Sequence, residues 1–296
     1  MKNNILNGIL FGAAASLWWG LIGVFYFKSV SFVGTIELVI HRTIWTAFLL
    51  TITTTLYSKW NNIISILKNI KKTFILLITG ILIFINWSTW IYAVVTNKLI
   101  DASFGYYIMP ILSLFFGILF LGESYNKQKI LSVTLVVVSV IYLLLNFNSV
   151  PWTGLIVAFT WSTYSLLRKK INIQVDLGLL LESLFMTPIA LLAFYLISYD
   201  GNNFFSIHNP AISFWLFLAG AMTVIPLFLF LKGVELAGLG TSGMIFFITP
   251  TCQFLLGILY YDEYFDINKL IGFIIIWIAV IIYLIDLTNK KEIKLV

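Results

Sequence analysis

One short stretch, residues 37–45 with the sequence ELVIHRTIW, carries the residues most capable of chemistry. Glu37, His41 and Trp45 recur at i, i+4 and i+8, so a helix would stack them on one face, with Arg42 about 100° round from His41. His41 and Arg42 could offer a substrate a positive or polarisable contact, with Glu37 as counter-charge or proton acceptor. The alternative is a structural tether, in which Glu37 pairs with Arg42 or with a neighbouring carbonyl.

Further candidates are polar groups, aromatic rings and prolines inside apolar runs. An amide in hydrocarbon needs hydrogen-bond partners. Aromatic rings could form a pocket for an amphipathic or cationic metabolite. An acid near a helix start could act as a gate or could stabilise the helix dipole. Ordinary packing is the alternative for most of the rings. The substrate-path candidates beyond the first stretch are Asn86, Trp87, Trp90, Tyr106, Tyr107 and Glu182. The prolines expected to kink helices and free carbonyls are Pro110, Pro188, Pro226 and Pro250.

The composition is that of an integral membrane protein. Of the 296 residues, 60% are hydrophobic and only 10% are charged, whereas a soluble chain has about 25% charged residues. Two histidines and one cysteine cannot assemble a His/Cys metal cluster, and the sequence has no glycine-rich ATP-binding loop. We therefore expect no cofactor and no nucleic-acid partner, and we assign the net charge of +6 to membrane topology.

Ten apolar runs predict an all-α polytopic protein with ten membrane-spanning helices. With a cytoplasmic N-terminus, 14 Lys and Arg residues fall in inner segments and 3 in outer ones, so both termini are expected to be cytoplasmic. The predicted spans are 5–27, 36–57, 73–96, 102–121, 130–147, 152–167, 178–199, 211–231, 240–261 and 270–287.

The first run raises the alternative of a cleaved signal peptide, because it follows a basic start. The run continues to Phe27, however, and its small residues recur every four positions, which favours an uncleaved helix in close contact with another helix. These small residues are Gly8, Gly12, Ser16 and Gly20.

Segments 106–129 and 246–269 reveal an internal repeat. At a shift of 140 residues they share proline, glycine, glutamate and lysine, including the pairs Pro110/Pro250 and Glu123/Glu263. Each half would hold five spans, an odd number, so the second copy must enter the membrane from the opposite side. We expect domains 1–147 and 148–296 as an inverted repeat, an arrangement typical of secondary transporters. Glu37 and Glu182 lie near the expected starts of the second span in the two halves.

The repeated segments, and others along the chain, resemble the doubled EamA domain of the drug/metabolite transporter superfamily, and within it the RarD branch. The resemblance covers almost the whole chain and rests on HRTIW (41–45), NWSTWIYAV (86–94), ESLFMTP (182–188), and the GILFLGE and GILYYDE endings of the fourth and ninth spans. It implies ten helices in an inverted five-plus-five repeat, a plasma-membrane location and permease activity on small metabolites or drugs.

The sequence thus predicts a multi-pass permease of the plasma (bacterial inner) membrane that moves a small metabolite or drug-like molecule by alternating access. A non-transporting scaffold or sensor is the alternative. An intramembrane enzyme would need a reactive set at depth, and the sequence offers neither paired mid-span aspartates nor a serine beside His41. The expected partners are a small-molecule substrate and membrane lipids, which the RKK run at 168–170 would contact. A second copy of the chain, forming a homodimer, is a possible further partner.

Overall fold

The computed structural model describes residues 2–96, 99–122, 126–145, 152–201, 203–259 and 267–289. Glu123 and Glu263 lie outside these ranges, as do the side chains of Tyr107 and Pro110 within their helix. The described part of the chain is helical throughout. Its α-helices are α1 (Lys2–Leu17), α2 (Gly23–Ser29), α3 (Thr35–Leu56), α4 (Trp60–Leu67), α5 (Ile70–Val95), α6 (Leu99–Leu121), α7 (Lys127–Leu145), α8 (Trp152–Ile171), α9 (Val175–Tyr199), α10 (Pro210–Ala237), α11 (Leu239–Ile245), α12 (Ile248–Leu259) and α13 (Ile267–Asn289).

Helices occupy every apolar run predicted from the sequence, and α4 is an additional short helix. Among the described residues, five helices are long and apolar enough to cross a membrane. They are Asn4–Ser29, Thr35–Leu56, Ile70–Ala93, Val175–Tyr199 and Pro210–Ala237. The protein is therefore a multi-pass membrane protein.

The prolines differ in their local structure. α9 and α10 continue as single helices through Pro188 and Pro226, and α6 continues through position 110. The ninth predicted run is instead divided into α11 and α12 by a turn at Phe246 and Phe247, just before Pro250. The first run is also irregular, because a π-helix at Trp18–Ile22 separates α1 from α2.

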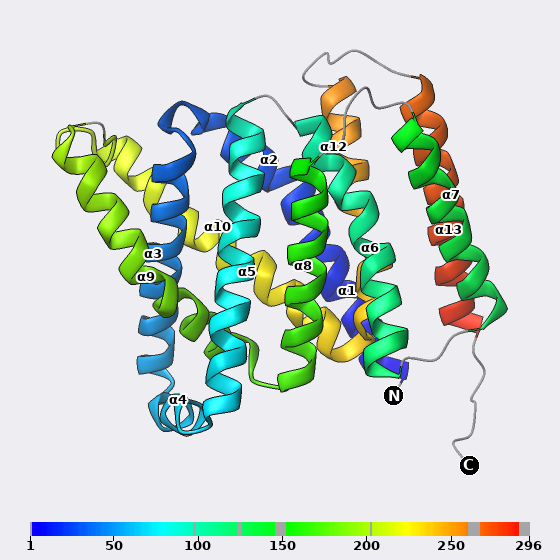
Figure 1. Ribbon diagram of the computed structural model, residues 1–296, viewed down its shortest axis with the longest axis horizontal. Coiled ribbons are helices and arrows are strands. Elements are labelled where there is room, and N and C mark those ends of the chain that lie inside the picture. Colours follow the sequence, from blue (N-terminus) through cyan, green and yellow to red (C-terminus); the bar gives the residue numbers. More distant parts are fainter. Residues whose placement is uncertain are drawn as a thin grey trace.

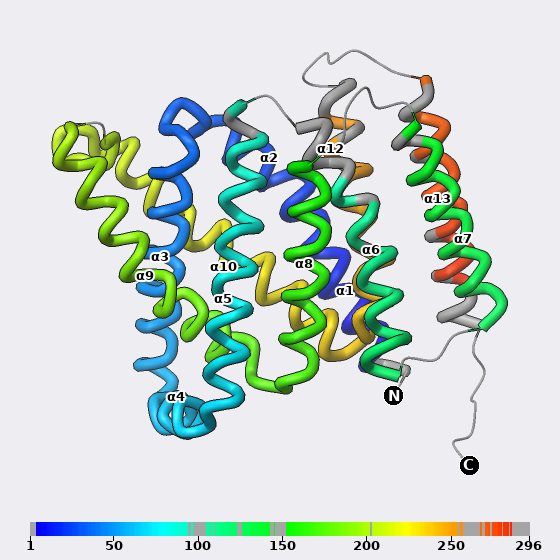
Figure 2. The backbone as a smooth tube through the Cα atoms, in the orientation of Figure 1, coloured from blue at the N-terminus to red at the C-terminus, as the bar shows by residue number. Residues whose placement is uncertain are grey.

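α1 begins and α13 ends at the same face of the helix bundle, which we call the terminal face (Figure 1). The helices alternate in direction, so α3 ends and α9 begins at this face, while α3 begins and α9 ends at the opposite face. Figure 2 shows α7 and α13 paired at one edge of the bundle and α3 and α9 packed together near the other.

The helix contacts repeat when the two halves of the chain are exchanged. α3 packs on α9, α6 on α11 and α7 on α13, and each of these pairs joins equivalent helices of the two halves. The contact of α1 with α10 has its equivalent in the contact of α8 with α5, and that of α3 with α10 in that of α9 with α5. Ser162 donates to the carbonyl of Met109, and Thr249, which the 140-residue shift pairs with Met109, donates to the carbonyl of Ser16. The internal repeat is thus present in the packing.

The small residues of the first span lie against α10, α11 and α12, as the sequence predicts. A side chain on Gly8 would collide with Ala237, and one on Gly20 would collide with Cys252. Small residues let helix backbones approach closely where no hydrophobic effect drives association, so this stripe fixes α1 to the second half of the chain.

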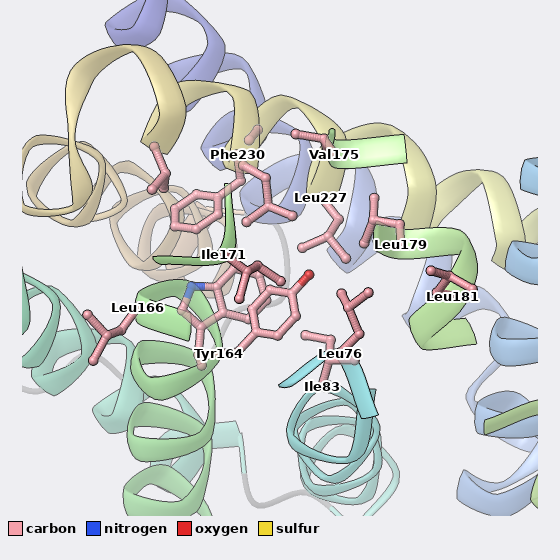
Figure 3. Packing of buried hydrophobic residues seen from close by; sticks show 14 of the residues in the cluster. Leu76, Ile83, Tyr164, Leu166, Ile171, Val175, Leu179, Leu181, Leu227 and Phe230 are labelled. Atoms are coloured by element: carbon pink, nitrogen blue, oxygen red, sulfur yellow. The ribbon is translucent and has the colours of Figure 1, made fainter. Parts of the chain in front are cut away.

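The largest apolar cluster lies where helices of both halves meet. Figure 3 shows Leu76 and Ile83 of α5, Tyr164 of α8, and Leu227 and Phe230 of α10 converging on one another. These five side chains are at most 3% exposed. The close packing of this cluster holds the polar side chains described below in defined positions.

Candidate functional site

Arg42 lies at the contact between the two halves of the chain and is 4% exposed. Its Nε donates a hydrogen bond of 2.8 Å to Oγ1 of Thr223 on α10. Its guanidinium carbon lies 4.5 Å from the ring centre of Trp87 on α5 and 5.2 Å from that of Phe27 on α2. These distances are within the range of cation–π interactions, so two aromatic faces and one hydroxyl hold the cation.

The close approach of α3 to α10 that makes this contact depends on Gly220. A β-carbon at Gly220 would lie 2.7 Å from the backbone carbon of Trp45, so no larger residue fits there without displacing α3. Thr223 lies one turn further along α10, opposite Arg42 on α3. The sequence analysis selected Arg42 but gave no indication of Thr223 as its partner.

None of the ion pairs in the described part of the chain includes Arg42. The tether expected between Glu37 and Arg42 is therefore absent among these residues. Tyr26 and Tyr106 lie close enough to Arg42 for electrostatic interaction, but both are neutral phenols at ordinary pH. Within the described ranges, the positive charge of Arg42 thus has polar and aromatic neighbours and no counter-ion.

Glu37 ties α3 to the loop that follows α9. Its carboxylate accepts hydrogen bonds of 2.9 and 3.0 Å from the backbone N–H of Phe204 and one of 2.9 Å from the N–H of Phe205. The side chain is 3% exposed. Hydrogen bonds to a carboxylate are stronger than those between neutral groups, so Glu37 is a firm attachment point at the opposite face.

Glu37, His41 and Trp45 form a continuous polar row along α3. The indole N–H of Trp45 donates to Nδ1 of His41 at 3.1 Å, and Nε2 of His41 lies 3.5 Å from Oε1 of Glu37. Because the indole can only donate, Nδ1 must accept, and this assigns the imidazole proton to Nε2, facing the carboxylate. The i, i+4, i+8 spacing accounts for this row, which orients Glu37 toward the loop.

Glu182 is the centre of a second buried polar cluster. Its carboxylate accepts a hydrogen bond of 2.6 Å from Thr79 of α5 and one of 3.2 Å from Tyr164 of α8, and it lies 3.5 Å from Nε of Arg168. Glu182 is 1% exposed and Arg168 5%. Arg168 also donates to the carbonyl of Val175 at 3.1 Å. Glu182 therefore has a counter-ion and two hydroxyl donors.

Two predictions about this cluster are wrong. Glu182 does not begin its helix, because α9 starts at Val175 and the acid in its first turn is Asp176. A helix-dipole role consequently falls to Asp176. The RKK run does not simply face lipid, because Arg168 is buried and Lys169 donates to the carbonyls of Val234 and Glu235 at the end of α10.

Arg42 and Glu182 hold equivalent positions in the two halves. They are separated by the repeat shift of 140 residues (182 − 42), as are Gly80 and Gly220 (220 − 80). Gly80 lies against the backbone of Glu182, just as Gly220 lies against the backbone of α3. The internal symmetry therefore relates a buried cation to a buried anion.

A cavity of about 10 Å³, roughly the room that one water needs, lies beside Glu182. Trp87, which covers Arg42, forms part of its wall, and Glu182 forms another part. Thr43 and Ser183, equivalent under the 140-residue shift, also line it. The cavity thus lies between α3, α5 and α9, with Glu182 on its wall and Arg42 behind Trp87, outside its lining.

Similar polar contacts join α3 and α9 at the two ends of this helix pair. At the opposite face, Glu37 in the first turn of α3 binds the loop after α9. At the terminal face, Asp176 in the first turn of α9 pairs with Lys59, which follows α3. By position in its helix, Asp176 is therefore the equivalent of Glu37, and Glu182 is not.

Of the remaining candidates, Asn86 takes part in helix packing and Trp90 lies near the aromatic rings around Arg42. Asn86 donates to the carbonyl of Val157 at 2.9 Å and to Thr160 at 3.0 Å, so its amide joins α5 to α8. Trp90 packs edge-on against Phe27, which places it behind the ring that faces Arg42. No group of three metal-binding side chains occurs among the described residues.

Sequence reasoning missed the residues that complete both clusters. Thr79, Tyr164 and Thr223 are ordinary polar residues in apolar runs, and nothing in the sequence marks which of the many such hydroxyls binds a charge. Arg168 had a signal, because it is the first cation of the RKK run and follows an apolar helix directly.

Comparisons with known proteins agree with this architecture. The model of the EamA-like transporter family matches residues 6–145 and again residues 149–285. The chain is 34% identical to an uncharacterized transporter from Vibrio cholerae over 95% of this chain and 92% of that protein, and 33% identical to Protein RarD from Salmonella typhi over 97% and 98%. A solved crystal structure that is 14% identical has the same fold, with a TM-score of 0.67 over 96% of this chain and 99% of that one. The resemblance to RarD proteins is confirmed, and this chain belongs to the EamA-like transporter family.

Proposed function

We propose that this protein is a secondary transporter that moves a small metabolite or drug-like molecule across the plasma (bacterial inner) membrane by alternating access. Ten helices cross the bilayer as two inverted halves, residues 1–147 and 148–296, and the terminal face is cytoplasmic. The excess of Lys and Arg on that side, 14 against 3, supports this orientation. The substrate path runs between the halves through α3, α5 and α6 and their equivalents.

The observation that carries this proposal is the placement of Arg42. Secondary transporters with inverted repeats bind substrate near the middle of the membrane, where the repeats meet. Arg42 comes from the first half, binds Thr223 of the second half, and has no ion-pair partner among the described residues. A scaffold would gain nothing from a buried charge left in this state, whereas a transporter can use it to bind its substrate.

The closures at the two ends of the α3–α9 contact support alternating access. Opening toward the outside would break the Glu37 hydrogen bonds to Phe204 and Phe205, and opening toward the cytoplasm would break the pair between Lys59 and Asp176. Each closure joins one half of the chain to the other. Both contacts are formed in the structure, and within this proposal we interpret that arrangement as an occluded state.

Cross-linking in proteoliposomes tests this mechanism. An exchange screen with a broad mixture of labelled metabolites first identifies a transported compound. Two double variants in a Cys252→Ser background, Glu37→Cys with Phe204→Cys and Lys59→Cys with Asp176→Cys, are then treated with a short, reducible, thiol-specific cross-linker. We expect either cross-link to stop flux and reduction to restore it, because each holds one gate closed.

The four single-cysteine variants are the matched controls, and treatment with the cross-linker should leave the flux of each at its own untreated level. Continued flux with either end cross-linked would contradict alternating access between α3 and α9. If purified, folded protein exchanges no compound from the mixture, a scaffold or sensor is the better description.

A further inference from the structure

We infer that the substrate is an organic anion whose carboxylate, or a similar planar anionic group, binds the terminal nitrogens of Arg42. This inference rests on the proposed transport function and specifies its substrate class. The reasons are that Arg42 has no counter-charge among the described residues, the geometry of its terminal nitrogens and the aromatic rings around it.

The first reason is a contrast between two buried arginines. Arg168 is 5% exposed and has Glu182 beside it, whereas Arg42 is 4% exposed and has no carboxylate within 4 Å among the described residues. Moving an ion out of water is unfavourable by several kcal/mol even after the protein relaxes. One hydroxyl and two aromatic faces offset part of this penalty, and an anionic ligand would offset the rest.

Glu37, the nearest acid along α3, is not a substitute for that ligand. Its two oxygens are engaged by the N–H groups of Phe204 and Phe205. Glu182, the acid at the equivalent position of the other half, is engaged by Arg168, Thr79 and Tyr164. Glu37 and Glu182 therefore already have partners.

The second reason is geometric. Thr223 occupies only Nε of Arg42, and within the described part of the chain neither Nη1 nor Nη2 has an acceptor. These two nitrogens form the fork that binds a carboxylate through two parallel hydrogen bonds. Trp87 and Phe27 lie over the guanidinium, so a ligand anion would approach the free edge of its plane.

The third reason concerns the rest of the ligand. Tyr106, close to Arg42, packs on Phe246, and Phe246 packs on Trp161 and Trp19, so a continuous set of aromatic rings extends from the guanidinium. Apolar surroundings of this kind suit an apolar or aromatic body and offer little to a hydrated inorganic ion. A cationic metabolite, which the aromatic residues alone would allow, is disfavoured by repulsion from Arg42.

The test measures binding independently of transport. Purified protein in detergent and low-chloride buffer is titrated with 3-phenylpropanoate and hexanoate, with their primary amides, and with 3-phenylpropylamine and hexylamine. Binding is followed as a rise in the midpoint of thermal denaturation and as a change in tryptophan fluorescence. Sodium chloride, sodium phosphate and phosphatidylglycerol are titrated separately as the inorganic and lipid sources of an anion.

We expect saturable binding of the carboxylates and none of the amides or amines. Arg42→Met should weaken carboxylate binding by about 30-fold or more, the usual result of removing one partner of a buried charge pair. Arg42→Lys should retain part of the affinity, because it keeps the charge and loses the fork. Lys232→Met, which removes an exposed cation paired with Glu235, is the matched control and should bind normally.

The other results are separable. The inference would be overturned by equal binding of amides or amines, by a response only to chloride, phosphate or the lipid, or by no response to any probe. Transport of a neutral or cationic metabolite would also contradict the inference, but it would support the proposed transport function. Carboxylate binding that depends on Arg42 in a protein without flux would support the inference and refute the transport proposal.

Discussion

Arg42 and Glu182 occupy equivalent positions in the two halves of the protein, yet their surroundings differ. Both are buried, and each lies within the second span of its half, Arg42 in α3 and Glu182 in α9. A glycine of the other half packs against each span, Gly220 against Trp45 of α3 and Gly80 against Glu182 itself. Glu182 has a counter-ion, Arg168, and two hydroxyl donors, Thr79 and Tyr164. Arg42 has a single hydroxyl acceptor and aromatic faces, and no counter-ion among the described residues.

The difference indicates separate roles for two charges that symmetry relates. A buried ion with its partner in place belongs to the folded structure, and removing that partner is strongly unfavourable. A buried ion without a partner weakens the fold and strengthens ligand binding. Under the proposed function the two related positions have different roles, so variants at the two positions should separate stability from transport.

The largest expected effect is on flux through Arg42. Arg42→Met should reduce transport by roughly 100-fold or more, because the substrate loses its charged contact, while the methionine fills much of the same space. The thermal midpoint of the detergent-solubilised variant should equal or exceed that of the natural protein. A variant that carries substrate normally would show that Arg42 has no part in binding.

The next largest expected effect is a loss of stability when the ion pair between Arg168 and Glu182 is broken. Arg168→Met leaves Glu182 buried without its counter-ion and should lower the free energy of unfolding by about 3–5 kcal/mol. The thermal midpoint and the yield of folded protein provide the measurement. If Arg42→Met destabilises the protein as much as Arg168→Met, the two arginines are both structural and the contrast between them fails.

A double substitution sharpens the comparison. Changing both Arg168 and Glu182 to methionine removes both charges, so most of the stability lost in Arg168→Met should return. The double-mutant cycle is completed with Glu182→Met and read by thermal denaturation. Strict additivity of the two single effects would mean that the charges do not interact.

The smallest effects concern the two hydroxyls. Thr79→Val removes a 2.6 Å hydrogen bond to the Glu182 carboxylate and should cost about 1.5–3 kcal/mol of stability. Thr223→Val removes the acceptor for Arg42 and should change stability less, but it should weaken transport several-fold because the guanidinium loses its orientation. Parallel denaturation and flux measurements on both valine variants test this division, and a reversed pattern would contradict it.

Much of the helical framework follows from the sequence for a simple reason. Long apolar runs and small residues at four-residue spacing are local properties, and bilayer thickness and helix geometry translate them directly into helices and contact faces. The row of Glu37, His41 and Trp45 is of the same kind, because its members share one helix. An irregularity near Pro250 was expected from the proline, whereas nothing in the sequence marked the π-helix at Trp18–Ile22.

By itself the sequence determined the membrane class, the helical runs, the internal repeat and the residues that carry charge at depth. The tertiary structure alone decided the partners: Arg42 binds a threonine 181 residues away, Glu37 binds amides 167 and 168 residues away, and Glu182 binds a threonine 103 residues away. Such pairings depend on which helices pack together and how closely, through glycines such as Gly80 and Gly220. Only that packing separates a charge with a partner from one that is free to bind a ligand.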